Sequence, residues 1–459
     1  MVESKWKEAI DETVQNLVTL IQFDTSNPPG NELPAILAIK EILENDGIPS
    51  DEIKILEPST NRANLVVRLK GDGSLRPLLL SGHIDAVPVQ RENWSRDPFG
   101  GEIADGCIWG RGALDMKGFL AMYLETFLMV WRSKLPLKRD LILAVVADEE
   151  ALYTMGSKFL VEQYRDLIDA EYGFTERGAM TVQIGNNRLY PIQVAEKGTL
   201  SIIMRTRGQP GQGAIPQSDN AILHLGEAIY KLKKIGWLPV HITATYRKMI
   251  EAVAEQIGLP LSLVTRLLST TWGASIALEF ASDSFKDFFV GILTNTFTPT
   301  ILGAGNFENI IPSEAEVLLS CRILPGQMME DLYQEIKAIT GDQVEFEPIA
   351  STFGTEFSTD TDMFRRLVKA TKRMDPNGIV TPGMMVAGTD ANEYQWAGIT
   401  FYGFTPGILP TDFPVAKLVH GDDERLPLSF IESGLPILWE VVTDSCMETP
   451  EIPLPLIRH

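Results

Sequence analysis

The chain has 459 residues, of which 44% are hydrophobic and 22% charged, a composition typical of a folded protein too long for one hydrophobic core. Its formal net charge of -21 repels phosphate backbones and anionic membrane surfaces, so we expect no nucleic-acid or membrane partner. Three widely spaced cysteines form no CxxC pair and no apolar run reaches the length of a membrane span, which favours the cytoplasm.

The first part of the chain predicts helices and strands in turn. Apolar residues at helical spacing predict a helix that ends near residue 23 and a second over 33–46. Apolar runs predict strands over 64–69, 78–81, 141–147 and 172–175. A segment rich in Gly, Asp and Pro, 94–109, is expected to be a loop across the top of the sheet. Further helices are predicted over 119–131, 156–164 and 428–444.

His83 and Asp85 follow the strand predicted at 78–81. In open α/β sheets the ligand site lies outside the carboxyl ends of the strands, so both side chains are expected there. Residues two apart on an extended segment point the same way, so the Asp85 carboxylate can hold the far nitrogen of the imidazole. This arrangement is typical of a metal-ligand histidine, although a structural histidine at a strand end is the alternative.

Other acids and a second histidine also stand at the ends of predicted elements. Asp115 opens the helix predicted at 119–131 after a glycine-rich turn, and it is either a ligand or the N-cap of that helix. Residues 148–150 place three adjacent carboxylates after a buried strand, where they repel one another unless a cation or a catalytic proton balances them; a solvated acidic turn is the alternative. Glu176 follows the next strand, and His420 precedes the last helix.

Together these residues can hold two divalent ions, with one carboxylate bridging them and a water between them activated as hydroxide. Glu149 lies beside a candidate ligand and is free to take the proton of that water.

Five motifs then resemble those of the M20 metallopeptidases, which include acetylornithine deacetylase, succinyl-diaminopimelate desuccinylase, aminoacylase-1 and Gly-X carboxypeptidases. The motifs are residues 82–88 (GHIDAVP), 110–118 (GRGALDMKG), 148–150 (DEE), 309–312 (NIIP) and 420–425 (HGDDER). They occur in order along nearly the whole chain, so the resemblance is specific.

The resemblance implies which residues hold the two metals. One metal is expected on His83 and Glu176, the other on Glu150 and His420, with Asp115 bridging. Zinc is the expected metal, with cobalt or manganese as alternatives, because mixed His and carboxylate sites accept several metals.

The resemblance also implies the roles of two further acids. Asp85 is expected to orient His83, and Glu149 to act as general acid and base. The peptide bond between Asp115 and Met116 is expected to be cis.

The family fold is an α/β catalytic domain with a mixed sheet and two metals, interrupted by an α+β lid that dimerises. We place the catalytic domain at 1–193 and 349–459 and the lid at 194–348, which makes a homodimer through the lid the expected assembly. In the lid, strands are predicted over 199–207 and 314–324 and a helix over 217–232, while 237–296 adds helical segments that small lids lack.

Three lid residues bear on substrate. Asn309 and Arg322 match positions that bind a substrate carboxylate in related enzymes, and an Arg fork can donate two parallel hydrogen bonds to it. A surface salt bridge is the alternative for Arg322. Gln212, in the loop 208–216, stands where the family carries a His that crosses the dimer to the scissile carbonyl oxygen; an exposed loop tip is the alternative there.

The expected function is hydrolysis of an amide bond next to a carboxylate, in N-acyl-amino acids or short peptides. Two other readings stay open. Gln212 is compatible with the same chemistry on a carbamoyl or xenobiotic amide, and a metal-binding pseudoenzyme is opposed by the intact Glu149.

Overall fold

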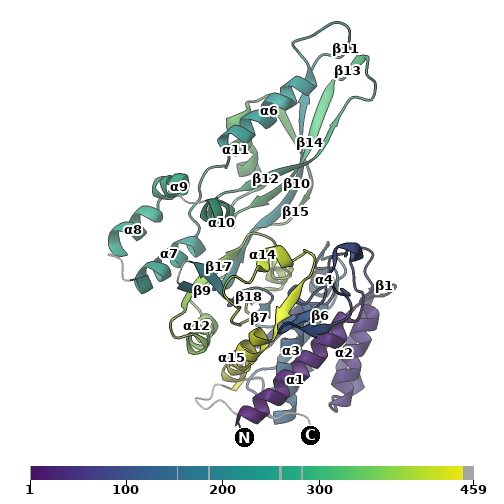
Figure 1. Ribbon diagram of the computed structural model, residues 1–459, viewed down its shortest axis with the longest axis vertical. Coiled ribbons are helices and arrows are strands. Elements are labelled where there is room, and N and C mark those ends of the chain that lie inside the picture. Colours follow the sequence, from purple (N-terminus) through teal and green to yellow (C-terminus); the bar gives the residue numbers. More distant parts are fainter. Residues whose placement is uncertain (1, 152, 185–186, 258–260, 281–282, 448–459) are drawn as a thin grey trace. The chain divides into compact units, whose positions relative to one another are not determined.

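The computed structural model describes residues 2–151, 153–184, 187–257, 261–280 and 283–447 (Figure 1). The chain divides into two units. Unit 1 comprises Met1–Val194, Phe357–Thr381 and Thr389–His459, and unit 2 comprises Ala195–Glu356 with Pro382–Gly388. Residue 348, where the sequence placed the end of the lid, lies within a strand of unit 2, Val344–Ser351.

Unit 1 contains a mixed sheet whose neighbouring strands β6, β3, β7 and β18 run parallel. The first three are the apolar runs that the sequence predicts as strands, and β3 and β6 are buried along their whole length. The strands with residues in unit 1 are β1 (Ile53–Ser59), β2 (Arg62–Leu69), β3 (Leu78–His83), β4 (Glu102–Ala104), β5 (Cys107–Trp109), β6 (Leu141–Val146), β7 (Tyr172–Thr175), β8 (Val182–Ile184), β9 (Asn187–Glu196), β17 (Ile379–Met385), β18 (Thr400–Gly403) and β19 (Arg425–Pro427).

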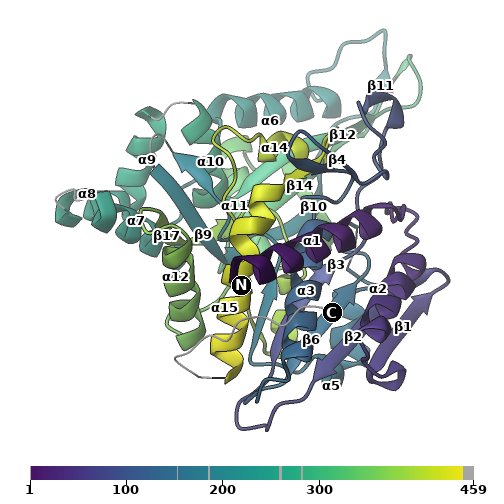
Figure 2. The ribbon, with the colours of Figure 1, turned by 60° about the horizontal axis from the view of Figure 1, so that its bottom comes forward.

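Helices cover both faces of this sheet. Helices α1, α3 and α15 pack together, with α3 against β3 (Figure 2). On the other face Leu160 of α4, Ile168 of α5 and Tyr394 of α13 join a core with Leu79 and Ile142 of the sheet. The α-helices of unit 1 are α1 (Val2–Ile21), α2 (Leu33–Asn45), α3 (Lys117–Ser133), α4 (Ser157–Gln163), α5 (Arg165–Ile168), α12 (Asp362–Met374), α13 (Ala391–Tyr394), α14 (Val415–Leu418) and α15 (Leu428–Met447).

The prediction of a loop over 94–109 is wrong for part of that segment. It contains the short hairpin β4–β5, and β5 also pairs with β19, with Trp109 opposite Arg425. The partner strand lies more than 300 residues further along the chain, so local composition carries no sign of the pairing.

Unit 2 is built on an antiparallel sheet with the order β12-β14-β10-β15. Along β10 buried and half-buried residues alternate, as in a strand with one face against a core. Its elements are β10 (Gly198–Arg207), β11 (Gly211–Gln212), α6 (Ala221–Ile235), α7 (Ala244–Ile257), α8 (Leu261–Leu268), α9 (Thr271–Phe280), α10 (Asp283–Leu293), β12 (Thr296–Ala304), β13 (Ile310–Ile311), β14 (Glu314–Ile323), α11 (Met329–Thr340), β15 (Val344–Ser351) and β16 (Thr355–Glu356).

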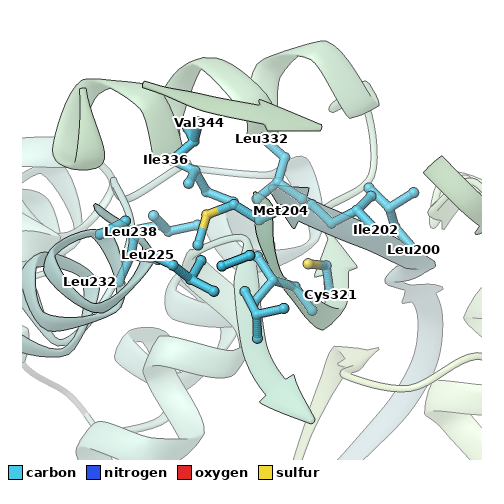
Figure 3. Packing of buried hydrophobic residues seen from close by; sticks show 14 of the residues in the cluster. Leu200, Ile202, Met204, Leu225, Leu232, Leu238, Cys321, Leu332, Ile336 and Val344 are labelled. Atoms are coloured by element: carbon cyan, nitrogen blue, oxygen red, sulfur yellow. The ribbon is translucent and has the colours of Figure 1, made fainter. Parts of the chain in front are cut away.

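Helices α6 and α11 cover the buried face of this sheet. Leu225 of α6 and Ile336 of α11 pack against Ile202 and Met204 of β10 and Cys321 of β14 (Figure 3). Helices α7 to α10 correspond to the extra helical segments predicted over 237–296 and form a separate cluster. Among the helices described in either unit, none has both the length and the apolar character needed to span a membrane.

Candidate metal centre

Three neighbouring parallel strands deliver candidate ligands to one edge of the sheet in unit 1. β3 ends at His83, which pairs with Val146 at the end of β6, so Glu149 and Glu150 follow close by. β7, on the other side of β3, leads directly into Glu176. Because the carboxyl ends of parallel strands meet at the same edge, these side chains converge.

Asp115 and His420 reach the same place from outside the sheet. Asp115 precedes α3, whose N-cap is Met116, so the alternative that Asp115 caps this helix is wrong. The Asp115–Met116 peptide bond is cis, as expected. His420 follows α14 in a left-handed conformation, with φ of 60°.

The five side chains form two groups that share Asp115. His83 Nε2 lies 3.5 Å from Asp115 Oδ1 and 3.7 Å from Glu176 Oε1. His420 Nε2 lies 3.2 Å from Asp115 Oδ2 and 3.1 Å from Glu150 Oε2. In each group one ligand atom per residue lies within 4.8 Å of the others. The two oxygens of Asp115 thus face different groups, which is the geometry a bridging carboxylate needs.

His83 gives the clearest sign that these groups fit metal ions. Its side chain is fully buried, and within the described residues no hydrogen-bond partner reaches Nε2. A buried polar nitrogen without a partner is costly unless something else binds it. Imidazole and carboxylate groups are ligands that zinc and similar divalent ions accept.

The electrostatics of the acids also favour a bound cation. Burial raises the pKa of Glu149 well above its usual value, and repulsion from Glu176 and Glu150 adds to this effect. Burial likewise raises the pKa of Glu176 and of Glu150, with repulsion from Asp115 in both cases. Divalent ions bound at this position would relieve that repulsion and favour the charged form of the carboxylates.

Asp85 makes contacts beyond the predicted one between its carboxylate and His83. His83 Nδ1 is 3.0 Å from the main-chain oxygen of Asp85 but 3.5 Å from its carboxylate, so the carbonyl is the nearer acceptor. The carboxylate instead accepts from the backbone N–H groups of Glu149 and Glu150 and from Asn27 Nδ2. Asp85 therefore fixes the turn that carries the predicted catalytic acid and one predicted ligand.

The sequence did not identify several residues that hold this centre. The fully buried Glu424 accepts from Arg111 Nη1 and from the backbone N–H groups of Gly112, Leu114 and Asp115. It thereby fixes the loop that presents Asp115. Glu424 stands in the motif 420–425, four residues after His420, and this is the signal that could have indicated it.

The remaining candidates lie in unit 2. Gln212 pairs with Ile310 in the two-stranded sheet β11–β13. The main-chain oxygen of Asn309 accepts a hydrogen bond from the backbone N–H of Gly213. Arg322 lies near the end of β14, where Nη1 donates to the main-chain oxygen of Cys321. The structure thus brings Gln212 and Asn309 together. Arg322 is far from them, because β14 begins at Glu314, next to β13, and runs about 25 Å before it reaches Arg322.

Comparison with known proteins identifies the family. Residues 79–444 match the model of the family described as "Peptidase family M20/M25/M40". The chain is similar to a probable carboxypeptidase S-like protein of Dictyostelium discoideum, with 28% identity over 80% of this chain and 71% of that one. It is also similar to an N-fatty-acyl-amino acid synthase/hydrolase of Mus musculus, with 27% identity over 84% of this chain and 77% of that one.

Solved structures show the same fold. An M20 family metallo-carboxypeptidase of Sulfolobus solfataricus superimposes with a TM-score of 0.65 at 17% identity, covering 94% of this chain and 98% of the other. The family match covers well over half of the chain and contains the converging histidines and acids. The chain therefore belongs to peptidase family M20/M25/M40 and is a metallohydrolase of that family.

Proposed function

We propose that this enzyme hydrolyses an amide bond next to a carboxylate, in N-acyl-amino acids or short peptides. The observation that carries the proposal is the pair of ligand groups sharing Asp115, with Glu149 beside them at 4.0 Å from His83 Nε2. The names of the relatives support the substrate class, because one is a carboxypeptidase-like protein and another an N-fatty-acyl-amino acid hydrolase.

Two divalent ions held by His83, Glu176, Glu150, His420 and Asp115 would polarise the scissile carbonyl and lower the pKa of the attacking water. Glu149 takes the proton of that water and passes it to the leaving amine nitrogen. Glu149 is buried beside both ligand groups, where a carboxylate can accept the proton of the water and release it again. We propose zinc as the resident metal.

Substrate recognition is assigned to unit 2. Arg322 is proposed to grip the substrate carboxylate, and Gln212 to donate a hydrogen bond to the scissile carbonyl oxygen. Because Arg322 and the Gln212 tip lie at opposite ends of β14, one copy of unit 2 cannot bring both to one small substrate. A homodimer through unit 2, in which the tip serves the partner subunit, supplies both and is part of the proposal.

Gln212 motivates a second candidate substrate. A neutral amide in place of an imidazole changes the donor at the carbonyl oxygen, which is compatible with a carbamoyl or xenobiotic amide. The pseudoenzyme reading is opposed by Glu149, which is buried at the centre with its backbone held by Asp85.

The test is a hydrolysis screen of N-acyl-amino acids with short and long acyl chains, dipeptides and N-carbamoyl-amino acids, each with zinc, cobalt or manganese. Every substrate is paired with its carboxamide. The proposal predicts turnover of acids and poor turnover of the matching carboxamides, and Arg322→Ala should remove that preference by lowering kcat/KM for the acids. Equal rates on acids and carboxamides would contradict the assignment of Arg322.

A further inference from the structure

Arg177 places a positive charge inside the centre. It directly follows Glu176 at the end of β7, and its φ of 54° lies in the left-handed region that a non-glycine residue rarely adopts. The backbone is held there by the next residues, since Thr405 N–H donates to the oxygen of Gly178 and Ala179 N–H to the oxygen of Pro191. This local fold directs the side chain toward the ligands.

The guanidinium contacts two predicted ligands at once. Its Nη2 is paired with Asp115 Oδ2, and its Nε donates to Glu176 Oε2 at 3.2 Å. The side chain is only 27% exposed, so water screens these ion pairs weakly. The effect on the partners is visible in Asp115: burial would raise its pKa, but Arg177 and the two histidines hold that pKa well below its usual value.

Each of these carboxylates can therefore bind either a metal ion or the Arg177 guanidinium. Asp115 belongs to both ligand groups and Glu176 to one, and both are also ion-paired with the guanidinium. Glu149 lies close enough for its charge to be attracted to Arg177 as well. A unit positive charge beside these oxygens offsets part of the repulsion among the acids, and it repels any divalent ion bound to the same oxygens.

We infer that Arg177 is a built-in counter-cation that positions Asp115 and Glu176 in the metal-free enzyme and lowers the affinity of the centre for divalent ions. The inference rests on the proposed metal-dependent function. Arg177 and the ions would compete for the carboxylates of Asp115 and Glu176. The centre would therefore need a higher free metal concentration to fill than it would without Arg177.

Two opposite effects distinguish this role from a purely structural ion pair. In Arg177→Gln the acids lose their counter-charge, so the Tm of the metal-free protein should fall. The same substitution removes a repulsive charge, so zinc should bind more tightly, by about tenfold or more. Arg177→Lys keeps the charge and should stay close to the parent in zinc affinity. A structural ion pair predicts the loss of Tm without the gain in affinity.

The experiment measures Tm of the metal-free full chain and the Kd for zinc, the latter by chelator competition starting from metal-loaded protein. Starting from loaded protein keeps the Kd measurable if Arg177→Gln does not fold without metal. The matched control is Arg188→Gln in the same unit, which breaks the pair with Asp375 and should lower Tm without changing the zinc Kd.

An unchanged or weaker zinc affinity in Arg177→Gln, with the parent binding zinc normally, overturns the inference and leaves the proposed function standing. A parent chain that binds no divalent ion overturns the proposed function and this inference together. Tighter binding in Arg177→Gln but not in Arg177→Lys or Arg188→Gln is the result that we expect.

Discussion

In the sequence Glu149 lies between two acids, Asp148 and Glu150, whose carboxylates already have partners. Asp148 is ion-paired with Arg62, and Glu150 faces His420 at 3.1 Å. We therefore expect Glu149→Gln to keep both metals and to lose the proton transfer, with kcat lower by on the order of 10²-fold or more.

Metal content by elemental analysis and kcat on the best substrate check this prediction. The matched control is Glu150→Gln, which should lose metal as well as activity because its carboxylate is a predicted ligand. Parent-like turnover by Glu149→Gln would remove Glu149 from the reaction.

Asp390 is a second acid whose charge is costly in the metal-free protein. Its carboxyl is fully buried near Asp85 and Glu176, and burial, together with their repulsion, raises its pKa from 3.8 to about 7. Between these values the folded protein holds more protons than the unfolded chain, so this group makes the free energy of unfolding fall as pH rises. The slope is at most about 1.4 kcal/mol per pH unit.

Asp390→Asn cannot titrate and should lose this contribution, becoming more stable than the parent at pH 7 in excess chelator. Denaturant unfolding of both proteins at several pH values between 4 and 7 measures the difference. Parallel stability curves for the two proteins would show that Asp390 does not titrate in this window.

The candidate ligands were easier to predict from the sequence than the residues that hold them in place. His83, Asp115, Glu150, Glu176 and His420 each stand at the end of a recognisable element or in a motif, and the structure brings all five together. Their supports depend on contacts between distant segments: Asn27 and Asp85 are 58 residues apart, and Arg111 and Glu424 are 313 apart. Arg111 and Glu424 stand within motifs, but no local pattern shows that the two residues of either pair lie together.

At the scale of elements, the loop before α3 depends on one carboxylate from the other end of the chain. Glu424 Oε1 accepts from Leu114 N–H at 2.7 Å, and Oε2 from Gly112 N–H at 3.0 Å. In Glu424→Gln one of these acceptors becomes an NH₂ donor facing other donors, so the loop should shift and take Asp115 with it. Substitution of such supporting residues typically lowers metal affinity by about 10- to 100-fold.

Zinc affinity by chelator competition tests this prediction. Glu440→Gln on α15 is the control, because Glu440 is paired with Arg373 at the surface and should leave zinc affinity unchanged. An unaltered zinc Kd in Glu424→Gln would mean that the loop holds Asp115 without Glu424.

The β11–β13 tip of unit 2 carries Gln212, at the position where the sequence resemblance implies a His. The exposed Gln212 can still donate to a developing oxyanion, but without the charge that a His can carry. Loss of one such donor lowers kcat by about 10²- to 10³-fold, so Gln212→Ala should show a fraction of that loss. Gln212→His should raise kcat on simple N-acyl-amino acids and add a pH dependence near the imidazole pKa.

The kcat values and pH profiles of the three proteins decide the role of this tip. If Gln212→Ala matches the parent on its best substrate, the tip is a solvent-exposed turn with no part in catalysis.

The elements themselves were predictable where they carry their own signal. The buried strands β3, β6 and β7 are short apolar runs, and α3 and α15 are long apolar helices. The short strands β5 and β19 were missed, because three residues form a strand only through the partner that pairs with them.

For the molecule as a whole, length predicted more than one core, and the structure contains separate cores in unit 1 and unit 2. The helices α7 to α10 add a further cluster within unit 2. Composition alone could not show which residues of so acidic a chain gather at one centre, because that depends on which strands are neighbours in the sheet.

The central claim is that catalysis depends on ions held by the two groups that share Asp115. The most direct measurement is hydrolysis of the best N-acyl-amino acid or dipeptide by protein that has been stripped with a chelator, dialysed and assayed with and without zinc. We predict that the stripped protein loses activity and regains it as zinc is added back, and that Asp115→Asn regains little because it weakens both groups. Full turnover by protein shown to be free of metal would contradict the account.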